Sequence, residues 1–95
     1  MNNKYNGWAN YATWRVQREI VDDLVEAECA DDIEHARELD ADEWRGMIEG
    51  WIDEIVFSSH REHDNGLMMD YADAFLSDVD YYELAEAAVD KAKNY

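Results

Sequence analysis

The sequence predicts an all-α fold, a compact bundle of four to five helices around a single aromatic-rich core. The first observation behind this is that apolar residues recur at helical spacing through most of the chain. The second is that proline is absent and glycine occurs only 4 times, so nothing marks a flexible linker or a domain boundary. Because 95 residues have room for one core, we expect residues 1–95 to form a single acidic helical domain.

The apolar stripes predict five helices, at residues 11–27, 32–38, 41–58, 66–76 and 81–93. The third stripe is the widest and runs from Trp44 to Val56. Residues 1–8 are too few for a periodicity, so a short strand there stays open. We expect the core to centre on seven large side chains, namely Trp14, Leu24, Trp44, Trp51, Ile55, Phe75 and Leu84.

Three Asp-x-x-Glu sequences are the third observation, because they stand where helices are expected to begin. They pair Asp31 with Glu34, Asp40 with Glu43, and Asp80 with Glu83. In such a capping box the Asp accepts from free backbone N–H groups and the Glu reaches back to the cap. These six of the 24 acids are therefore expected to have a structural role, and only the others are candidates for function.

Gly46 and Gly50 lie one turn apart within the third predicted helix, where each costs up to ~1 kcal/mol relative to alanine. In the favoured interpretation, a neighbouring helix or an aromatic ring packs closely against them. In the other, they form a bare patch for a second subunit or a partner.

The acidic residues are confined to the body of the chain. Residues 19–90 hold all 24 Asp and Glu against three Arg, a net charge of −21, whereas residues 1–18 hold no acid. B-DNA carries one charge per ~1.7 Å, so a duplex as long as a globule of this size, ~30 Å, carries roughly 18 charges. The acidic body therefore matches DNA in charge per length, which makes DNA mimicry a hypothesis to weigh.

The acids outside the capping boxes recur in rows at helical spacing, where like charges cost a few tenths of a kcal/mol per pair and bases are largely absent. We expect these rows to stand in for phosphates, and reversing their charge to leave the melting temperature unchanged or higher while weakening partner binding. The first and third helices are favoured for contact because they are longest and most densely charged. The expected partner-binding residues are Glu19, Asp22, Asp23, Glu26, Asp42, Glu49, Asp53, Asp70 and Asp73.

Catalysis and metal binding find little support. Cys29 lies among Glu26, Glu28, Asp31 and Asp32, whose field disfavours a thiolate nucleophile. Residues 60–64 read His-Arg-Glu-His-Asp, which is not the His-Glu-x-x-His of zinc proteases, so a solvated loop is favoured over a metal site. We therefore expect neither an enzyme nor a bound cofactor or metal.

The single cysteine excludes an internal disulfide, and neither a signal-peptide pattern nor an apolar run of 18 residues occurs. We therefore expect a cytoplasmic protein, in the host cytoplasm if a phage encodes it. We expect no contact with a membrane.

Residues 6–14 read Asn-Gly-Trp-Ala-Asn-Tyr-Ala-Thr-Trp. This resembles the Asn-Gly-Trp-x-Asn-x-x-Thr-Trp start of small proteins from phages and other mobile elements. Residues 76–86 look like their closing segment, with Asp80 and Tyr81 where Asn and Trp are usual. Together the two segments cover about a quarter of the chain. The resemblance implies a mobile-element origin and, by analogy with anti-restriction and anti-CRISPR proteins that imitate DNA, inhibition of a host defence.

From the residues themselves, Asn-Gly predicts a turn, Trp8 is expected to fold back on the first helix, and Asn10 is expected to cap that helix. The motif at residues 6–14 is therefore interpreted as an architectural clasp. It carries no catalytic residue that we can transfer.

Two functions lead. One is a DNA-mimicking inhibitor that occupies a basic DNA-binding surface of a host defence protein complex, without binding nucleic acid itself. The alternative is an acidic protein-interaction module or homo-oligomer, such as a homodimer, without DNA mimicry. A third, a halophilic protein, fits the acid-free residues 1–18 poorly. Salt separates them, because mimicry weakens with salt, apolar oligomerisation does not, and halophilic folding improves.

Overall fold

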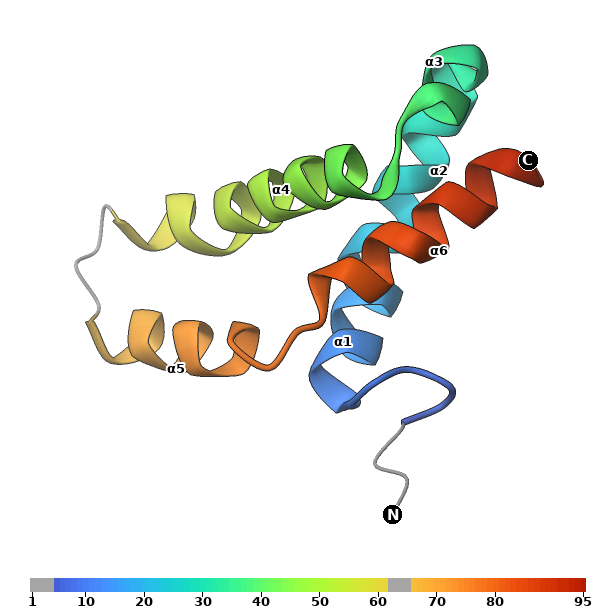
Figure 1. Ribbon diagram of the computed structural model, residues 1–95. Coiled ribbons are helices and arrows are strands. Elements are labelled where there is room, and N and C mark those ends of the chain that lie inside the picture. The colour runs from blue at the N-terminus through green and yellow to red at the C-terminus, as the bar shows by residue number, and fades with distance from the viewer. Residues whose placement is uncertain (1–4, 62–65) are drawn as a thin grey trace.

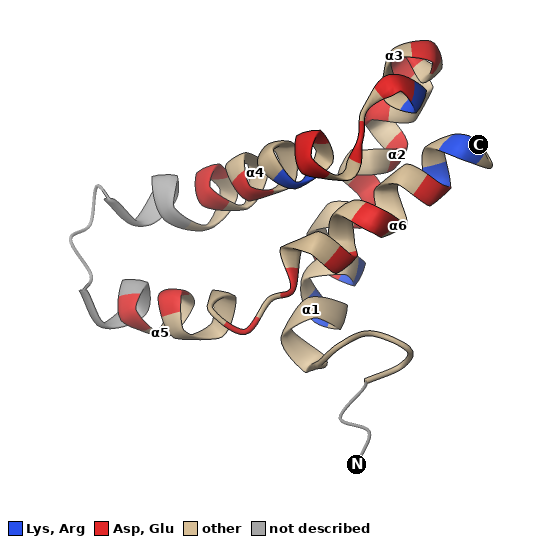
Figure 2. Ribbon diagram, in the orientation of Figure 1, with Lys and Arg blue, Asp and Glu red and all other residues tan. Residues whose placement is uncertain are grey.

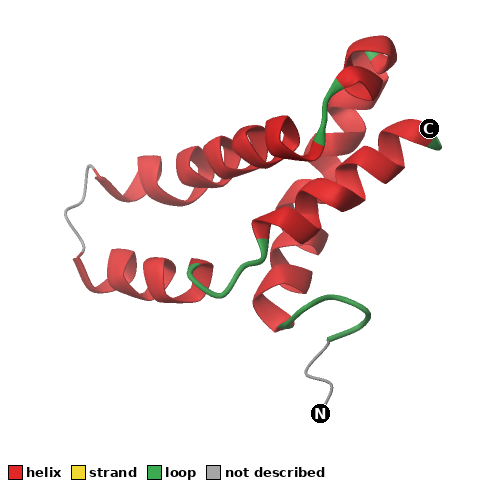
Figure 3. Cartoon of the chain, in the orientation of Figure 1, coloured by secondary structure: helices red, strands yellow, loops and turns green. Residues whose placement is uncertain are grey.

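The computed structural model describes the backbone of residues 5–61 and 66–95, and the side chains of residues 5–56 and 70–95. The helical segments are α1 (Tyr11–Val16), a π-helical turn η1 (Gln17–Val21), α2 (Asp22–Asp31), α3 (Ile33–Glu38), α4 (Ala41–Arg61), α5 (Gly66–Leu76) and α6 (Tyr81–Lys93). Because α1, η1 and α2 follow without a break, the described residues form five helices, and they contain no strand (Figure 3). The all-α prediction is confirmed.

The helices form a flat assembly with extents of 41 × 39 × 19 Å. Helix α6 packs chiefly on α4 and also contacts α3 and α1. Figure 1 shows α4 and α5 running in opposite directions as a hairpin whose far end extends beyond α1, α2 and α6. We call residues 49–61 of α4 together with α5 the arm.

The first helix contains a π turn that the sequence pattern did not predict. Its buried apolar residues are spaced by four, five, four and four positions, namely Ala12, Val16, Val21, Val25 and Cys29. Residues five apart do not share one face of a regular α-helix, and the wider turn at Gln17–Val21 brings Val16 and Val21 onto the same face. Trp14 and Leu24, which were expected in the core, are only half-buried.

The core forms where α4 meets α6. Trp44 and Leu84 are fully buried, as expected, and Trp51 is partly buried against them. Small residues on α6 allow the two helices to approach, since Ala85 and Ala88 are also buried. The expectation fails at Ile55 and Phe75, which are 50% and 38% exposed. Both lie on the arm, which extends beyond the N-terminal end of α6 (Figure 1).

The capping boxes are only partly as predicted. Asp40 and Glu43 form a complete box, with the Glu43 amide donating to Asp40 Oδ1 at 2.8 Å and the Asp40 amide donating to Glu43 Oε1 at 3.1 Å. The box at Asp31 is wrong, because Asp31 ends α2 and Asp32 caps α3 by accepting from the His35 amide at 3.1 Å. Capping thus fixes where α3 and α4 begin, although the cap of α3 is Asp32 and not the predicted Asp31.

Gly46 and Gly50 are exposed on α4, and a Cβ atom added to either meets nothing within 4 Å. The interpretation as a close-packing site is therefore wrong. What remains is a bare stretch of helix surface, whose cost in helix propensity the contacts of the fold do not explain.

Candidate partner-binding surface

The N-terminal motif forms a tight turn followed by a helix cap. Asn6 and Gly7 have φ values of 48° and 88°, the pair of positive angles that a type I′ turn requires. The Tyr5 and Trp8 backbones exchange two hydrogen bonds across it, of 2.7 and 2.8 Å. Trp8 is half-buried against the core, as its predicted fold-back on the first helix requires.

Asn10 and Thr13 fasten the start of α1 to the segment that precedes α6. Asn10 Oδ1 accepts from the Thr13 amide at 2.9 Å and from the Thr13 hydroxyl at 2.8 Å. Asn10 Nδ2 donates to the Asp78 carbonyl at 2.6 Å, and the Asp80 amide donates to Thr13 Oγ1 at 2.8 Å. The two side chains therefore join segments 67 and 68 positions apart. This confirms the interpretation of the motif as a clasp.

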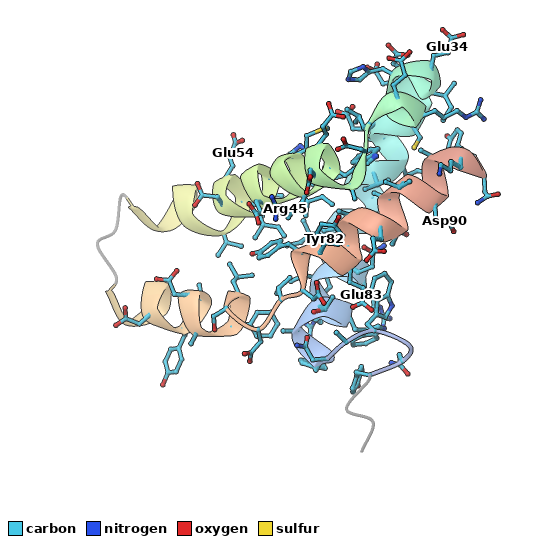
Figure 4. All side chains as sticks on the ribbon, viewed as in Figure 1. Glu34, Arg45, Glu54, Tyr82, Glu83 and Asp90 are labelled. Atoms are coloured by element: carbon cyan, nitrogen blue, oxygen red, sulfur yellow. The ribbon has the colours of Figure 1, made fainter. Side chains whose placement is uncertain are left out.

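Glu83 completes the clasp instead of a capping box. Asp80 caps α6 by accepting from the Glu83 amide at 3.0 Å, but the Glu83 carboxylate turns away and accepts from the Ala9 amide at 2.8 Å. Figure 4 shows Glu83 on the side of α6 that faces α1 and the N-terminal segment. This acid has a structural role, as predicted, but a different one. The clasp is defined by Ala9, Asn10, Thr13, Asp78, Asp80 and Glu83.

The acidic row on the first helix is largely compensated. Lys91 of α6 places its Nζ 2.9 Å from both Asp22 Oδ1 and Glu26 Oε2, and Arg15 Nε lies 2.7 Å from Glu19 Oε1. Hydrogen bonding to Asp22, the largest cause, together with that to Glu26 raises the pKa of Lys91, although burial opposes it. Of this row only Asp23 makes no ion pair with a described residue. The sequence hid this because Lys91 is 69 positions from Asp22.

The acids on α4 and α5 are arranged differently. Asp42 lies 3.9 Å from Arg45, a loose pair on an exposed face, whereas Glu49 and Asp73 make no ion pair with any described residue. All of the expected contact acids on these two helices are exposed, namely Asp42, Glu49, Asp53, Asp70 and Asp73. Figure 2 shows acidic positions on both helices of the hairpin.

Three of these acids meet around one hollow, which we call the acidic hollow. It has a volume of about 410 Å³ and lies between α4, α5 and the start of α6. Its rim carries Glu49 and Asp53 from α4 and Asp73 from α5, and its apolar lining includes Ile52 and Leu76. The structure therefore brings together residues from two separate predicted rows.

Tyr81 also lines the acidic hollow and was not among the predicted contact residues. Burial raises the pKa of its phenol, and the charges of Glu49 and Asp53 raise it further. The only sequence signal was its position one residue after the Asp80 cap, which points to the first turn of α6. Its hydroxyl adds a polar group that keeps its proton beside the carboxylates.

This arrangement suits a long basic side chain. The stem of a Lys or Arg can lie along apolar surface while its head stays near charge and water, and the hollow offers both: Ile52 and Leu76 within, and three carboxylates at the rim. Such pairing does not require a metal, and no group of His, Cys, Asp and Glu side chains in the described part of the chain could hold one.

The other candidate chemistry can be placed only in part. Cys29 is buried, and burial first, then the charges of Glu26 and Glu28, raises the pKa of its thiol, so its thiolate is disfavoured as predicted. The His-Arg-Glu-His-Asp run at residues 60–64 lies outside the described side chains. In the described residues, no helix is long and apolar enough to cross a membrane.

Comparison with known proteins places the chain in a family. A family model, described as a family of unknown function (DUF7249), matches residues 1–94. The chain belongs to this family. No curated protein and no solved structure matches it significantly. The function of this DUF7249 member must therefore be argued from its own surface.

Proposed function

We propose that the protein is a DNA-mimicking inhibitor that occupies a basic DNA-binding surface of a host nucleic-acid-binding defence complex. The observation that carries the proposal is the acidic hollow, where Glu49 and Asp73 are exposed and make no ion pair with a described residue. A basic partner supplies the counter-charge that the fold itself leaves out. By contrast, Asp22 and Glu26 already have a cation in Lys91.

The spacing of the acids on α4 supports imitation of a phosphate row. A helix rises 1.5 Å per residue, so the steps from Asp42 to Glu49 and from Glu49 to Asp53 are roughly 10.5 and 6 Å along the axis. The phosphates of one strand of B-DNA rise ~3.4 Å per step along the duplex axis, so three and two steps rise roughly 10 and 7 Å. Measured along the axis, the α4 acids thus approximate every second or third phosphate of one strand.

Phosphate imitation also explains why the charge is tolerated. A net charge of −16 on 95 residues destabilises the compact state through repulsion, and the ion pairs of Lys91 and Arg15 offset part of it on the side formed by α1, α2 and α6. In a complex with a basic DNA-binding groove, the same charges become attractive and accelerate encounter. The cost in the free protein is then offset by binding.

The experiment that tests the proposal is capture of proteins from a host lysate on the immobilised chain, followed by elution with duplex DNA or with salt. We expect duplex DNA to compete with the immobilised chain and displace the captured complex. We also expect the affinity of the complex for the chain to fall steeply between ~50 and ~200 mM salt. A captured complex that binds this chain and duplex DNA at the same time contradicts mimicry and leaves the acidic interaction module as the function.

Two variants with equal net charge provide the control. Glu49→Gln with Asp73→Asn removes two outward acids, and Asp22→Asn with Glu26→Gln removes two acids paired with Lys91. Both reduce the net negative charge by two, from −16 to −14. We expect the first to weaken binding of the captured complex by at least ~10-fold and the second by less than ~3-fold. Equal losses indicate that only the total charge matters.

A further inference from the structure

A second hollow lies on another side of the arm, between α1–η1 and α5. Its volume is about 400 Å³, and we call it the aromatic groove. Val16 and Ile20 line it from the first helix, Val56 from α4, and Tyr71 and Phe75 from α5. Tyr71 is 67% exposed, so a large apolar ring stands open to water at the rim of an apolar groove.

The exposed aromatic surface continues from the groove to the N-terminal segment. The Tyr11 ring lies 6.4 Å from the Phe75 ring, edge to face, and 5.1 Å from the Tyr5 ring. Tyr5, Tyr11 and Phe75 are all among the exposed large side chains. Contiguous exposed apolar surface of this kind marks a site where another molecule binds.

Charge selects which molecule can bind there. Among the described residues that line the groove, Glu19 is the only carboxylate, and Arg15 holds it at 2.7 Å. Residues 1–18 contain no acid, so the adjoining aromatic surface is also free of negative charge. Two copies with a charge of −16 each repel one another across acidic surface. The aromatic groove is the face on which a second copy meets the least repulsion, and its Arg15 and Glu19 suit reciprocal pairing about a two-fold axis.

The amount of surface that the chain exposes is consistent with a second copy as the molecule that binds the groove. The chain exposes 6268 Å², whereas a monomer of 11.1 kDa typically exposes roughly 5,700 Å². Summed over all 95 residues, the difference of roughly 600 Å² is comparable to the ~800 Å² that each partner buries in a standard protein interface. The radius of gyration points the same way, at 14.2 Å against ~12 Å for a typical domain of this length.

We propose that the aromatic groove is the interface of a two-fold symmetric homodimer, in which Tyr71 and Phe75 of each copy pack against the groove of the other. On α5, Asp73 lies two positions from each of these residues, about 200° around the helix, and so on the opposite face. The dimer therefore leaves the acidic hollow of each copy open. The dimer does not depend on the proposed function, but if both hold, one dimer presents two acidic hollows to its target.

Sedimentation equilibrium of the whole chain tests this proposal. We expect a mass of twice 11.1 kDa at high concentration, with a dissociation constant that falls as salt is raised from ~50 to ~500 mM, because salt screens the repulsion between copies. Partner binding through the acidic hollow has the opposite salt dependence, which separates the two ideas. A chain that stays monomeric at ~1 mM protein in high salt overturns the dimer.

Variants locate the interface. Phe75→Glu is expected to raise the dimer dissociation constant at least ~30-fold, because it places a charge in the desolvated centre of the contact. Tyr82→Glu is the matched control, since Tyr82 is 47% exposed on α6 and does not line the groove. If Phe75→Glu does not fold by circular dichroism, Tyr71→Glu replaces it. Equal effects of the groove variant and the control overturn the interface. Glu49→Gln with Asp73→Asn lies outside the groove and lowers the repulsion between copies, so it must not weaken dimerisation.

Discussion

The two sides of this molecule treat the same residue types in opposite ways. On the side formed by α1, α2 and α6, carboxylates are bound within the fold, since Glu83 accepts from the Ala9 amide and Asp22 and Glu26 share Lys91. On the arm, Glu49 and Asp73 face the acidic hollow with no ion pair to a described residue. Acidic residues that look equivalent in sequence therefore divide into those that stabilise the fold and those that are left for a partner.

The largest effect is expected at the clasp. Thr13 is 0% exposed, and its hydroxyl accepts from the Asp80 amide and donates to Asn10. Thr13→Val keeps the shape but leaves these two groups without their partner, so we expect a loss of about 2 kcal/mol in the free energy of unfolding, measured by urea denaturation. Thr13→Ser keeps the hydroxyl and should lose about half as much. A larger loss in the Ser variant contradicts the hydrogen-bonding role.

The next effect concerns Lys91, which joins α6 to α2. Lys91→Glu removes two ion pairs and places a third carboxylate beside Asp22 and Glu26. We expect it to lower the free energy of unfolding by about 1–2 kcal/mol. Lys93→Glu makes the same change in charge on the same helix, where no described ion pair is lost, and should cost less than about 0.5 kcal/mol. Similar losses in both variants show that net charge alone sets the stability.

Charge reversal is expected to change the stability in opposite directions on the two sides of the molecule. The sequence leads us to expect that reversal at Asp22 and Glu26 leaves the melting temperature unchanged or higher, but the pairs with Lys91 reverse that expectation. Asp22→Lys with Glu26→Lys should lower the free energy of unfolding by about 1 kcal/mol. Glu49→Lys, which removes the repulsion with Asp53 one turn away, should leave it unchanged or raise it by a few tenths of a kcal/mol. Thermal melts at low salt compare the two.

The smallest effect is the pH dependence that Lys91 contributes. Its pKa is raised in the folded protein, so the folded state holds this proton more tightly than the unfolded state. The resulting stability is present in full below the unfolded pKa of ~10.4 and is lost as pH rises through the folded pKa. As pH rises from about 9.5 to 11.5, the free energy of unfolding should therefore fall less for Lys91→Met than for the wild type. Cys29 and Tyr81, whose pKa values are also raised, give the remaining loss the same sign.

Periodicity and capping chemistry predicted the helices well, because both depend on residues close in sequence. Helices α5 and α6 begin and end where expected, and α4 begins at Ala41 as predicted. The π turn was missed because an α-helical template cannot place Val16 and Val21, five positions apart, on one face.

Burial and charge compensation were less predictable, because both depend on which helices meet. Ile55 and Phe75 lie on apolar stripes but on the arm, where α6 no longer covers them. The sequence predicted that the contact acids are exposed. It did not predict that some of them, such as Asp22, pair with a base while others, such as Glu49, make no ion pair with a described residue. That division follows from Lys91, which the sequence places in the last turn of a different helix from Asp22.

In the proposed function, the partner contacts the arm acids Glu49 and Asp73, and not Asp22 and Glu26, which pair with Lys91. Carboxylate labelling with a carbodiimide and an amine, read by mass spectrometry with and without a captured partner, tests it at each residue. We expect the partner to protect Glu49 and Asp73 from labelling, while Asp22 and Glu26 are labelled equally in both samples. Protection of Asp22 and Glu26, with Glu49 and Asp73 still labelled, contradicts it.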